Sequence, residues 1–362
     1  HITEGPHKDT QELRTHAFVW MNRYLKGSDE EIDTRVEKPF TPEQLKVFDQ
    51  LPADERVTTA HEWFVPAATY ESLPQSAQDL DRQRQAAAQQ LREQSLRAWP
   101  NGADDLKIRK HDTFTNDGIT VQALDYISEF PNRLPLIAMY PADIKEVKSV
   151  DVELLDSTML RYMLPHITRM AGGEGTPDVP LDEAEQEASN KAWQSRLERL
   201  KTSPNTMLVF LPPRGVGPTE WSRDAKERIH IQRRFLLLGE SLDGQRLWDV
   251  TRGLAAIRAE VAGKPEITIR ADGELANVAI YLPLFDDDIK ALELSHIPAS
   301  PHAGATLLNV AKFLAPEQLL LLAASNVKSI RIAAAQPENG RWQEIVDTSA
   351  KLGRGRIEFG VQ

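Results

Sequence analysis

Residues 267–285 read ITIRADGELANVAIYLPLF, and this stretch decides the fold class. A β-branched run of strand length leads through a short polar turn into a segment of helical period. Strand, tight turn and helix form the frame of a nucleophile elbow, which normally carries G-x-S-x-G. On this frame the nucleophile position falls on Gly273, with Ala271 and Leu275 at the flanking glycine positions. We disfavour Asp272 as a displaced nucleophile, and we expect no Ser, Cys or carboxylate at this turn within hydrogen-bond reach of a His.

Strand and helix patterns alternate on both sides of this elbow. The strands expected before it are Lys107–His111, Ile119–Ser128, Leu134–Tyr140 and Ser149–Leu155, read as an antiparallel meander, and then Thr206–Leu211. Glu266–Arg270, Ile289–Leu294, Ser329–Ala333 and Arg356–Phe359 complete the set. The expected helices are Glu183–Leu200, residues 224–262 with a break near Gly239–Gly244, Leu275–Phe285, Ala305–Phe313, Pro316–Ala324 and Trp342–Leu352. This alternation predicts an α/β fold with a mixed, mainly parallel sheet flanked by helices, in which 206–211, 266–270, 289–294 and 329–333 are adjacent.

The first hundred residues have a different character. Residues 10–25 predict a helix with Thr10 as its N-cap and Gly27 at its C-terminal end. Residues 28–66 contain four prolines and little periodicity, so we expect them to run over the surface. A helix over 75–97 has few large apolar residues, and we expect it to be more exposed than the helix at 228–238. We therefore divide the chain into residues 1–27, a connector at 28–104 and an α/β domain at 105–362.

Composition excludes several classes of function. The formal net charge is −11, so the chain has no basic footprint for nucleic acid. Cysteine is absent, which removes thiol nucleophiles, thiolate metal sites and disulfides. No apolar run approaches the roughly 18–20 residues that span a bilayer. None of the nine histidines pairs with another at the i, i+4 spacing of a helical zinc site, and we expect neither a metal nor a cofactor.

Four further stretches could carry chemistry. His7 follows Gly5 and Pro6 on a loop ahead of a helix, where an exposed imidazole can serve as a general base or simply be a surface residue. The loop PPRGVGPTEW at 212–221 could turn its N–H groups toward an anion, or its glycines could only shape a turn. Ser241 has the wrong spacing for a serine motif and is expected to cap a helix, and His296 and His302 are expected to be loop residues.

The segments GPHKDTQELR and AFVWMNRYLKG, near the start of the chain, resemble the C-terminal end of an α/β-hydrolase of the acetyl xylan esterase type. RGVGPTEW and HIQRRFLLLGESLDGQRLWDVTRGLAAI resemble the degenerate second hydrolase-like half of two-part proteins of this family in planctomycete-type bacteria. This resemblance implies that His7 is the triad base for a Ser and an Asp outside this chain. It also implies an inactive second half, acetylated polysaccharide or oligosaccharide as substrate, an N-terminal hydrolase segment as partner, and a periplasmic or secreted protein.

Two functional hypotheses follow from these observations. In the first, the chain is the C-terminal portion of a secreted serine carbohydrate esterase, with His7 activating a serine elsewhere. In the second, it is a non-catalytic α/β-hydrolase-like module that binds polysaccharide or supports a partner chain.

Overall fold

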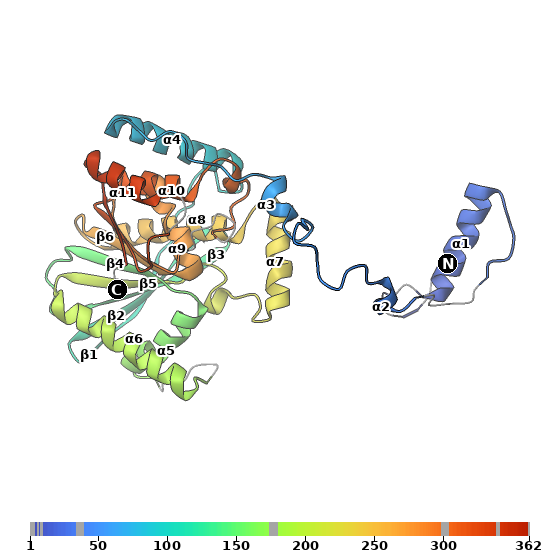
Figure 1. The fold of residues 1–362 in the computed structure, drawn as a ribbon. Helices are drawn as coiled ribbons and strands as arrows, with labels where there is room; N and C mark the ends of the chain where they lie inside the picture. The colour runs from blue at the N-terminus through green and yellow to red at the C-terminus, as the bar shows by residue number, and fades with distance from the viewer. Residues whose placement is uncertain are drawn as a thin grey trace. The chain divides into compact units, whose positions relative to one another are not determined.

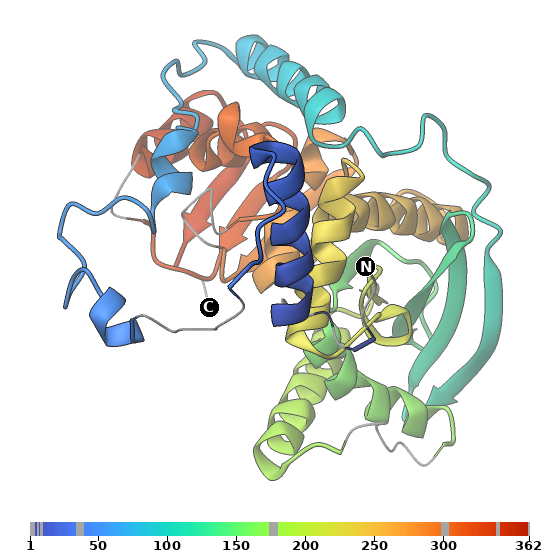
Figure 2. The same cartoon turned by 90° about the vertical axis from the view of Figure 1, so that its right-hand side faces the viewer.

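The chain divides into two units, residues 1–64 and residues 65–362. The computed structural model describes residues 4–5, 7, 10–33, 40–173, 180–297, 304–337 and 341–360. Figures 1 and 2 show both units in two orientations.

The first unit contains a single long helix. Helix α1 (Gln11–Met21) continues as one π-helical turn, Asn22–Lys26. Thr10 caps it by accepting a hydrogen bond from the Leu13 N–H at 3.3 Å, and Gly27 ends it with a φ of 66°, which confirms both expected caps. Two short helices follow, α2 (Pro42–Leu45) and α3 (Ala60–Phe64). No side chain described between residues 28 and 66 is buried, as the irregular, proline-containing sequence predicts.

The second unit is built on a nine-stranded sheet with the order β1-β2-β3-β5-β4-β6-β7-β8-β9 among the described residues. Its strands are β1 (Arg109–Asn116), β2 (Ile119–Glu129), β3 (Asn132–Pro141), β4 (Ser149–Leu154), β5 (Thr206–Leu211), β6 (Glu266–Asp272), β7 (Ile289–Ser295), β8 (Ser329–Ile332) and β9 (Arg356–Phe359). Strands β1 to β3 and the β3–β5 pair are antiparallel, and the remaining pairs are parallel. The mixed, mainly parallel sheet is confirmed.

Strand β4 corrects two details of the predicted topology. The meander has three strands rather than four, because β4 lies parallel between β5 and β6. Thr206–Leu211 therefore shares the sheet with Glu266–Asp272 without pairing with it. Val150–Leu154 is buried throughout, as interior parallel strands are, whereas an edge of a meander would alternate between buried and exposed positions.

Helices cover both faces of this sheet (Figures 1 and 2). One face carries α4 (Ala77–Gln94), α8 (Leu242–Glu260), α9 (Gly273–Ala279), α10 (Pro316–Ala324) and α11 (Trp342–Lys351); the other carries α5 (Ser157–Met170) and α6 (Glu183–Thr202), and α7 is Ala225–Leu237. Two helix predictions were too long: α9 stops at Ala279 before a 3₁₀ turn, and only the 3₁₀ turn Val310–Lys312 forms within 305–313. Helix α5 was not predicted.

The expected exposures of α4 and α7 are wrong. Leu80, Ala87 and Leu91 of α4 are buried, whereas no residue of α7 is buried. The three α4 residues are seven and four positions apart, so they share one helix face and pack together. The spacing of a few apolar residues, rather than their number, decided which helix entered the core.

A row of alternating charges crosses the sheet face on the α5–α6 side. Glu153, Arg270, Glu293, Arg331 and Glu358 stand directly opposite one another on β4, β6, β7, β8 and β9. Arg331 bonds to Glu293 at 3.3 Å and to Glu358 at 3.2 Å, and Arg270 pairs with Glu293. Such cross-strand ion pairs keep this part of a parallel sheet compatible with water.

Candidate functional site

The elbow lies where the sequence predicts it. Strand β6 ends at Asp272 and helix α9 begins at Gly273, whose φ is +54°. Apart from its two neighbours and the backbone of its own helix, nothing lies within 4 Å of the position that a Cβ on Gly273 would occupy. The turn thus keeps the backbone of a nucleophile elbow and presents open space where the nucleophile would stand.

One expectation about this turn is wrong. The Asp272 carboxylate lies within hydrogen-bond reach of a histidine, because Oδ1 is 2.5 Å from Nδ1 of His296. Asp272 pairs with Ser295 across the parallel strands β6 and β7, so the next residue of the β7 chain comes within its reach. The hydrogen bond that His296 donates to the Asp272 carboxylate raises the pKa of His296 and favours its charged form. Both side chains are largely exposed, and no serine joins them among the hydrogen bonds of the described residues.

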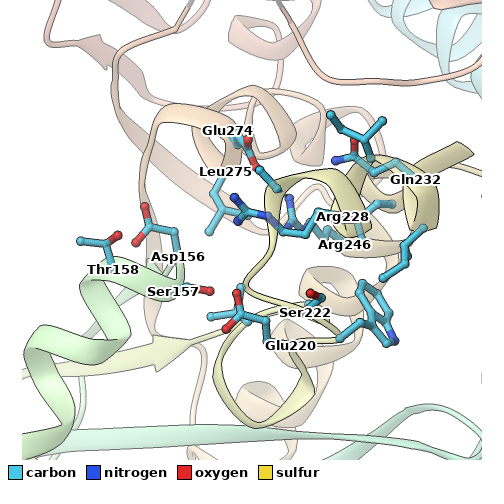
Figure 3. Close-up of a pocket in the computed structure, with 17 residues that line it drawn as sticks. Asp156, Ser157, Thr158, Glu220, Ser222, Arg228, Gln232, Arg246, Glu274 and Leu275 are labelled. Atoms are coloured by element: carbon cyan, nitrogen blue, oxygen red, sulfur yellow. Dashed lines mark hydrogen bonds and ion pairs between the residues drawn. The ribbon is translucent and has the colours of Figure 1, made fainter. Parts of the chain in front are cut away.

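A cavity of about 470 Å³ opens beside the elbow, at the carboxyl ends of β4, β5 and β6. Figure 3 shows side chains converging on it from three directions. Asp156, Ser157 and Thr158 come from the start of α5; Glu274 and Leu275 come from the first turn of α9; and the loop after β5, with α7 and α8, supplies the remaining wall. The carboxyl edge of an open α/β sheet is where ligand sites form, so this cavity is the candidate site.

Arg246 is a buried charged residue in the lining of this cavity. Its Nη1 lies 3.3 Å from both Asp243 and Glu274. Burial raises the pKa of Asp243, against the opposing effects of Arg246 and of the N–H of Thr306 at 2.8 Å. The Glu274 side chain is exposed, so the buried Arg246 links Asp243 to a carboxylate that faces solvent at the cavity.

The loop 212–221 forms one wall of the cavity, and a buried ion pair holds it. Gly215 and Gly217 both have positive φ values, which supports the interpretation that these glycines shape a turn. Arg214, between strand and turn, bonds through Nε and Nη2 to the carboxylate of Asp249 on α8. The spacing of the two glycines predicted the turn, but no local sequence pattern predicted the Arg214–Asp249 ion pair that holds it.

Of the other predicted residues, neither Ser241 nor His296 lines the cavity. Ser241 caps α8 by accepting a hydrogen bond from the Gly244 N–H at 3.1 Å, as expected. His7 is exposed in the first unit, and its neighbour Asp9 and His302 lie outside the described residues. A serine–histidine pair, Ser189 and His166 at 3.0 Å, was not predicted. It is buried between α5 and α6, and Ser189 donates its proton to the Tyr162 carbonyl, so it is a packing contact rather than a nucleophile.

Two kinds of site are absent from the described ranges. No group of three or more His, Asp or Glu side chains there could hold a metal ion. No helix there is long and apolar enough to cross a bilayer.

Comparison with known proteins places the fold. No protein-family model and no curated protein matches the chain. A structure from Bacteroides fragilis assigned as an acetyl xylan esterase superposes with a TM-score of 0.57 at 12% identity, over 81% of this chain and 77% of that one. Two glucuronoyl esterases are also similar. The one from Solibacter usitatus has a TM-score of 0.53 at 11% identity, over 81% and 94% of the two chains. The one from Teredinibacter turnerae has a TM-score of 0.50 at 14% identity, over 82% and 84%. At identities this low, the superpositions show only that the fold is shared, and that fold is α/β-hydrolase-like.

Proposed function

We propose that residues 65–362 are a non-catalytic carbohydrate-binding half of a carbohydrate esterase. One observation carries this proposal: the elbow and its cavity are retained, but Gly273 stands at the nucleophile position. A serine esterase needs an oxygen nucleophile at that point, with a base beside it. Even without a nucleophile, a cavity of this size can still bind a carbohydrate.

The lining of the cavity suits a sugar. Trp221 is about half exposed at 49% and offers an apolar ring face, on which a pyranose can stack. Ser157 and Thr158 offer hydroxyl groups, while Glu220 and Glu274 offer acceptors. A few placed polar groups around an apolar platform are typical of small-ligand sites.

Catalysis in the complete esterase is assigned to His7, as the general base for a serine that lies outside this chain. The support is the resemblance of residues 5–27 to the last triad loop of acetyl xylan esterases, together with the exposure of His7. A periplasmic or secreted site of action and the division at residues 27 and 104 belong to the same proposal. Replacing His7 with Ala in the full-length protein should lower kcat for acetyl release by orders of magnitude while folding is unchanged. Near-normal activity would remove His7 from the mechanism.

The binding proposal is tested on the chain as it stands. We expect xylo-oligosaccharides to bind in a calorimetric titration and Trp221→Ala to abolish that binding. Phe130→Ala is the control, because Phe130 is a 73% exposed aromatic residue of the same unit that does not line the cavity. A fluorophosphonate probe should leave residues 65–362 unlabelled. Labelling of a serine in that range, or no binding of any oligosaccharide, would overturn the proposal.

A further inference from the structure

A smaller cavity lies at the carboxyl ends of β7 and β8. It measures about 70 Å³, and helices α9, α10 and α11 contribute to its wall. Ile297 follows β7 and Ile332 ends β8, so this cavity opens at the same edge of the sheet as the first. That edge is where ligands bind in open α/β sheets. The two cavities share no described residue, so the smaller one is a separate candidate site.

Two polar side chains in this wall have no hydrogen-bond partner among the described residues. Asn277, on α9, is 9% exposed, and Tyr281, four residues later, is 7% exposed. Buried polar side chains are nearly always hydrogen-bonded, because an unpaired one loses its hydration without compensation. In the described part of the chain, the side-chain atoms that are both fully enclosed and unpaired belong to Arg84 and Arg354. The polar atoms of Asn277 and Tyr281 therefore still touch open space, and the cavity that both residues line is that space.

The rest of the wall is apolar. Among the described residues that line the cavity, the other side chains are hydrophobic, as Ile280, Leu314 and Trp342 are, and none is charged. A carboxylate or an ammonium ion would be buried there without a counter-charge. The volume is about half of the roughly 150 Å³ in which an apolar protein cavity binds benzene, so it suits a ligand of about three or four heavy atoms.

The two polar groups define what the ligand must offer. The Asn277 amide has N–H donors and an oxygen acceptor, and the Tyr281 hydroxyl adds a donor. Burial raises the pKa of Tyr281, and the charge of Asp243 adds to this effect, so the hydroxyl keeps its proton at neutral pH. One aliphatic hydroxyl matches this set, because its two lone pairs accept from the two donors and its proton goes to the amide oxygen. A ketone or an ether would leave the amide oxygen unpaired.

We propose that this cavity binds a short, uncharged aliphatic alcohol, whose hydroxyl bonds to Asn277 and Tyr281 and whose alkyl chain packs against the apolar wall. The inference goes beyond the proposed carbohydrate-binding function, because it concerns a different cavity and a different class of ligand. Water is the competing occupant, since a water molecule also satisfies an amide and a hydroxyl.

The test titrates the full chain with three probes of equal length: 1-propanol, propionate and propylammonium. Methyl NMR follows Ile280 and Ile332, which line the cavity, and Ile357 on β9, which does not. We expect 1-propanol to shift the first two resonances with a roughly millimolar Kd, as suits so few atoms, and to leave Ile357 unchanged. The two ions should cause no such shift. Equal shifts with all three probes would overturn the inference, and so would no shift with 1-propanol, which would leave water as the occupant.

Tyr281→Phe and Asn277→Leu remove the polar groups with little change of shape. Each should weaken 1-propanol binding about two- to tenfold, the range that a neutral hydrogen bond gives. Neither should lower the midpoint of urea unfolding, because neither group loses a partner within the protein. Tyr140→Phe is the control, because Tyr140 on β3 does not line the cavity, and its affinity for 1-propanol should be unchanged. Unchanged affinity in both cavity variants, or equal weakening in Tyr140→Phe, would overturn the assignment to Asn277 and Tyr281.

Discussion

Arg214 and Asp249 form a buried, two-point ion pair, with Nε 2.8 Å from Oδ2 and Nη2 2.7 Å from Oδ1. The backbone N–H of Arg214 bonds to the same carboxylate at 3.0 Å, and Ser128 bonds to it at 2.5 Å. Asp249 is fully buried, so these four contacts replace its hydration. The pair fixes the loop after β5 to helix α8 and thereby shapes one wall of the candidate cavity.

Replacing Asp249 with Ala should destabilise the chain by about 3–5 kcal/mol, because Arg214 would stay buried without its two-point partner and with only Glu129, at 3.4 Å, as a counter-charge. Urea unfolding measures this loss. Glu266→Ala is the control, since Glu266 pairs with Lys328 where both side chains are more than half exposed, and such a pair contributes about 0–1 kcal/mol. Similar losses in the two variants would show that the Arg214–Asp249 pair has no special role.

Gly273→Ala should cost about 1–2 kcal/mol, because an L-residue is strained at a φ of +54° even where its side chain has room. Gly102→Ala is the comparison: that glycine also has open space around it but no positive φ, and we expect a change within about 0.5 kcal/mol. Thermal or urea unfolding distinguishes them. An equally stable Gly273→Ala protein would mean that the turn relaxes and that the elbow geometry is not fixed.

Leu91→Ala in α4 should destabilise the second unit by about 2–5 kcal/mol, since Leu91 is fully buried and its removal leaves a cavity. Leu237→Ala in α7 should change stability by less than about 0.5 kcal/mol, because that side chain is 86% exposed. The two variants delete the same atoms from two helices, so urea unfolding compares burial directly. The reverse order would show that α4 does not belong to the core in solution.

His166 should make stability depend on pH. Burial lowers its pKa, so the unfolded chain binds a proton at higher pH than the folded chain does. Its contribution is fully present above the ordinary histidine pKa of about 6.5 and is lost as pH falls through and below that value. His166→Phe keeps a ring against Trp193, whose centroid lies 5.0 Å away, and should flatten this slope in urea unfolding between pH 5 and 8. Parallel pH profiles for the two proteins would contradict the assignment.

The sequence by itself determined the local elements of this protein. The first helix begins after Thr10 and ends at Gly27, and Ser241 caps α8, as the sequence predicts. The sequence also predicted the position of the elbow at Gly273 to the residue. These features depend on contacts within a few residues and on backbone conformations that particular side chains favour. The alternation of strands and helices also sufficed for the mainly parallel sheet, because short connections leave few topologies.

Only the tertiary structure decided the rest. The insertion of β4 between β5 and β6, the burial of α4 and the approach of His296 to Asp272 all join segments that are distant in sequence. The same is true of Asp249 and Arg214. Each depends on which faces meet when the apolar surfaces of the whole unit are buried together. A local pattern fixes which face of an element is apolar but not which distant element will cover it.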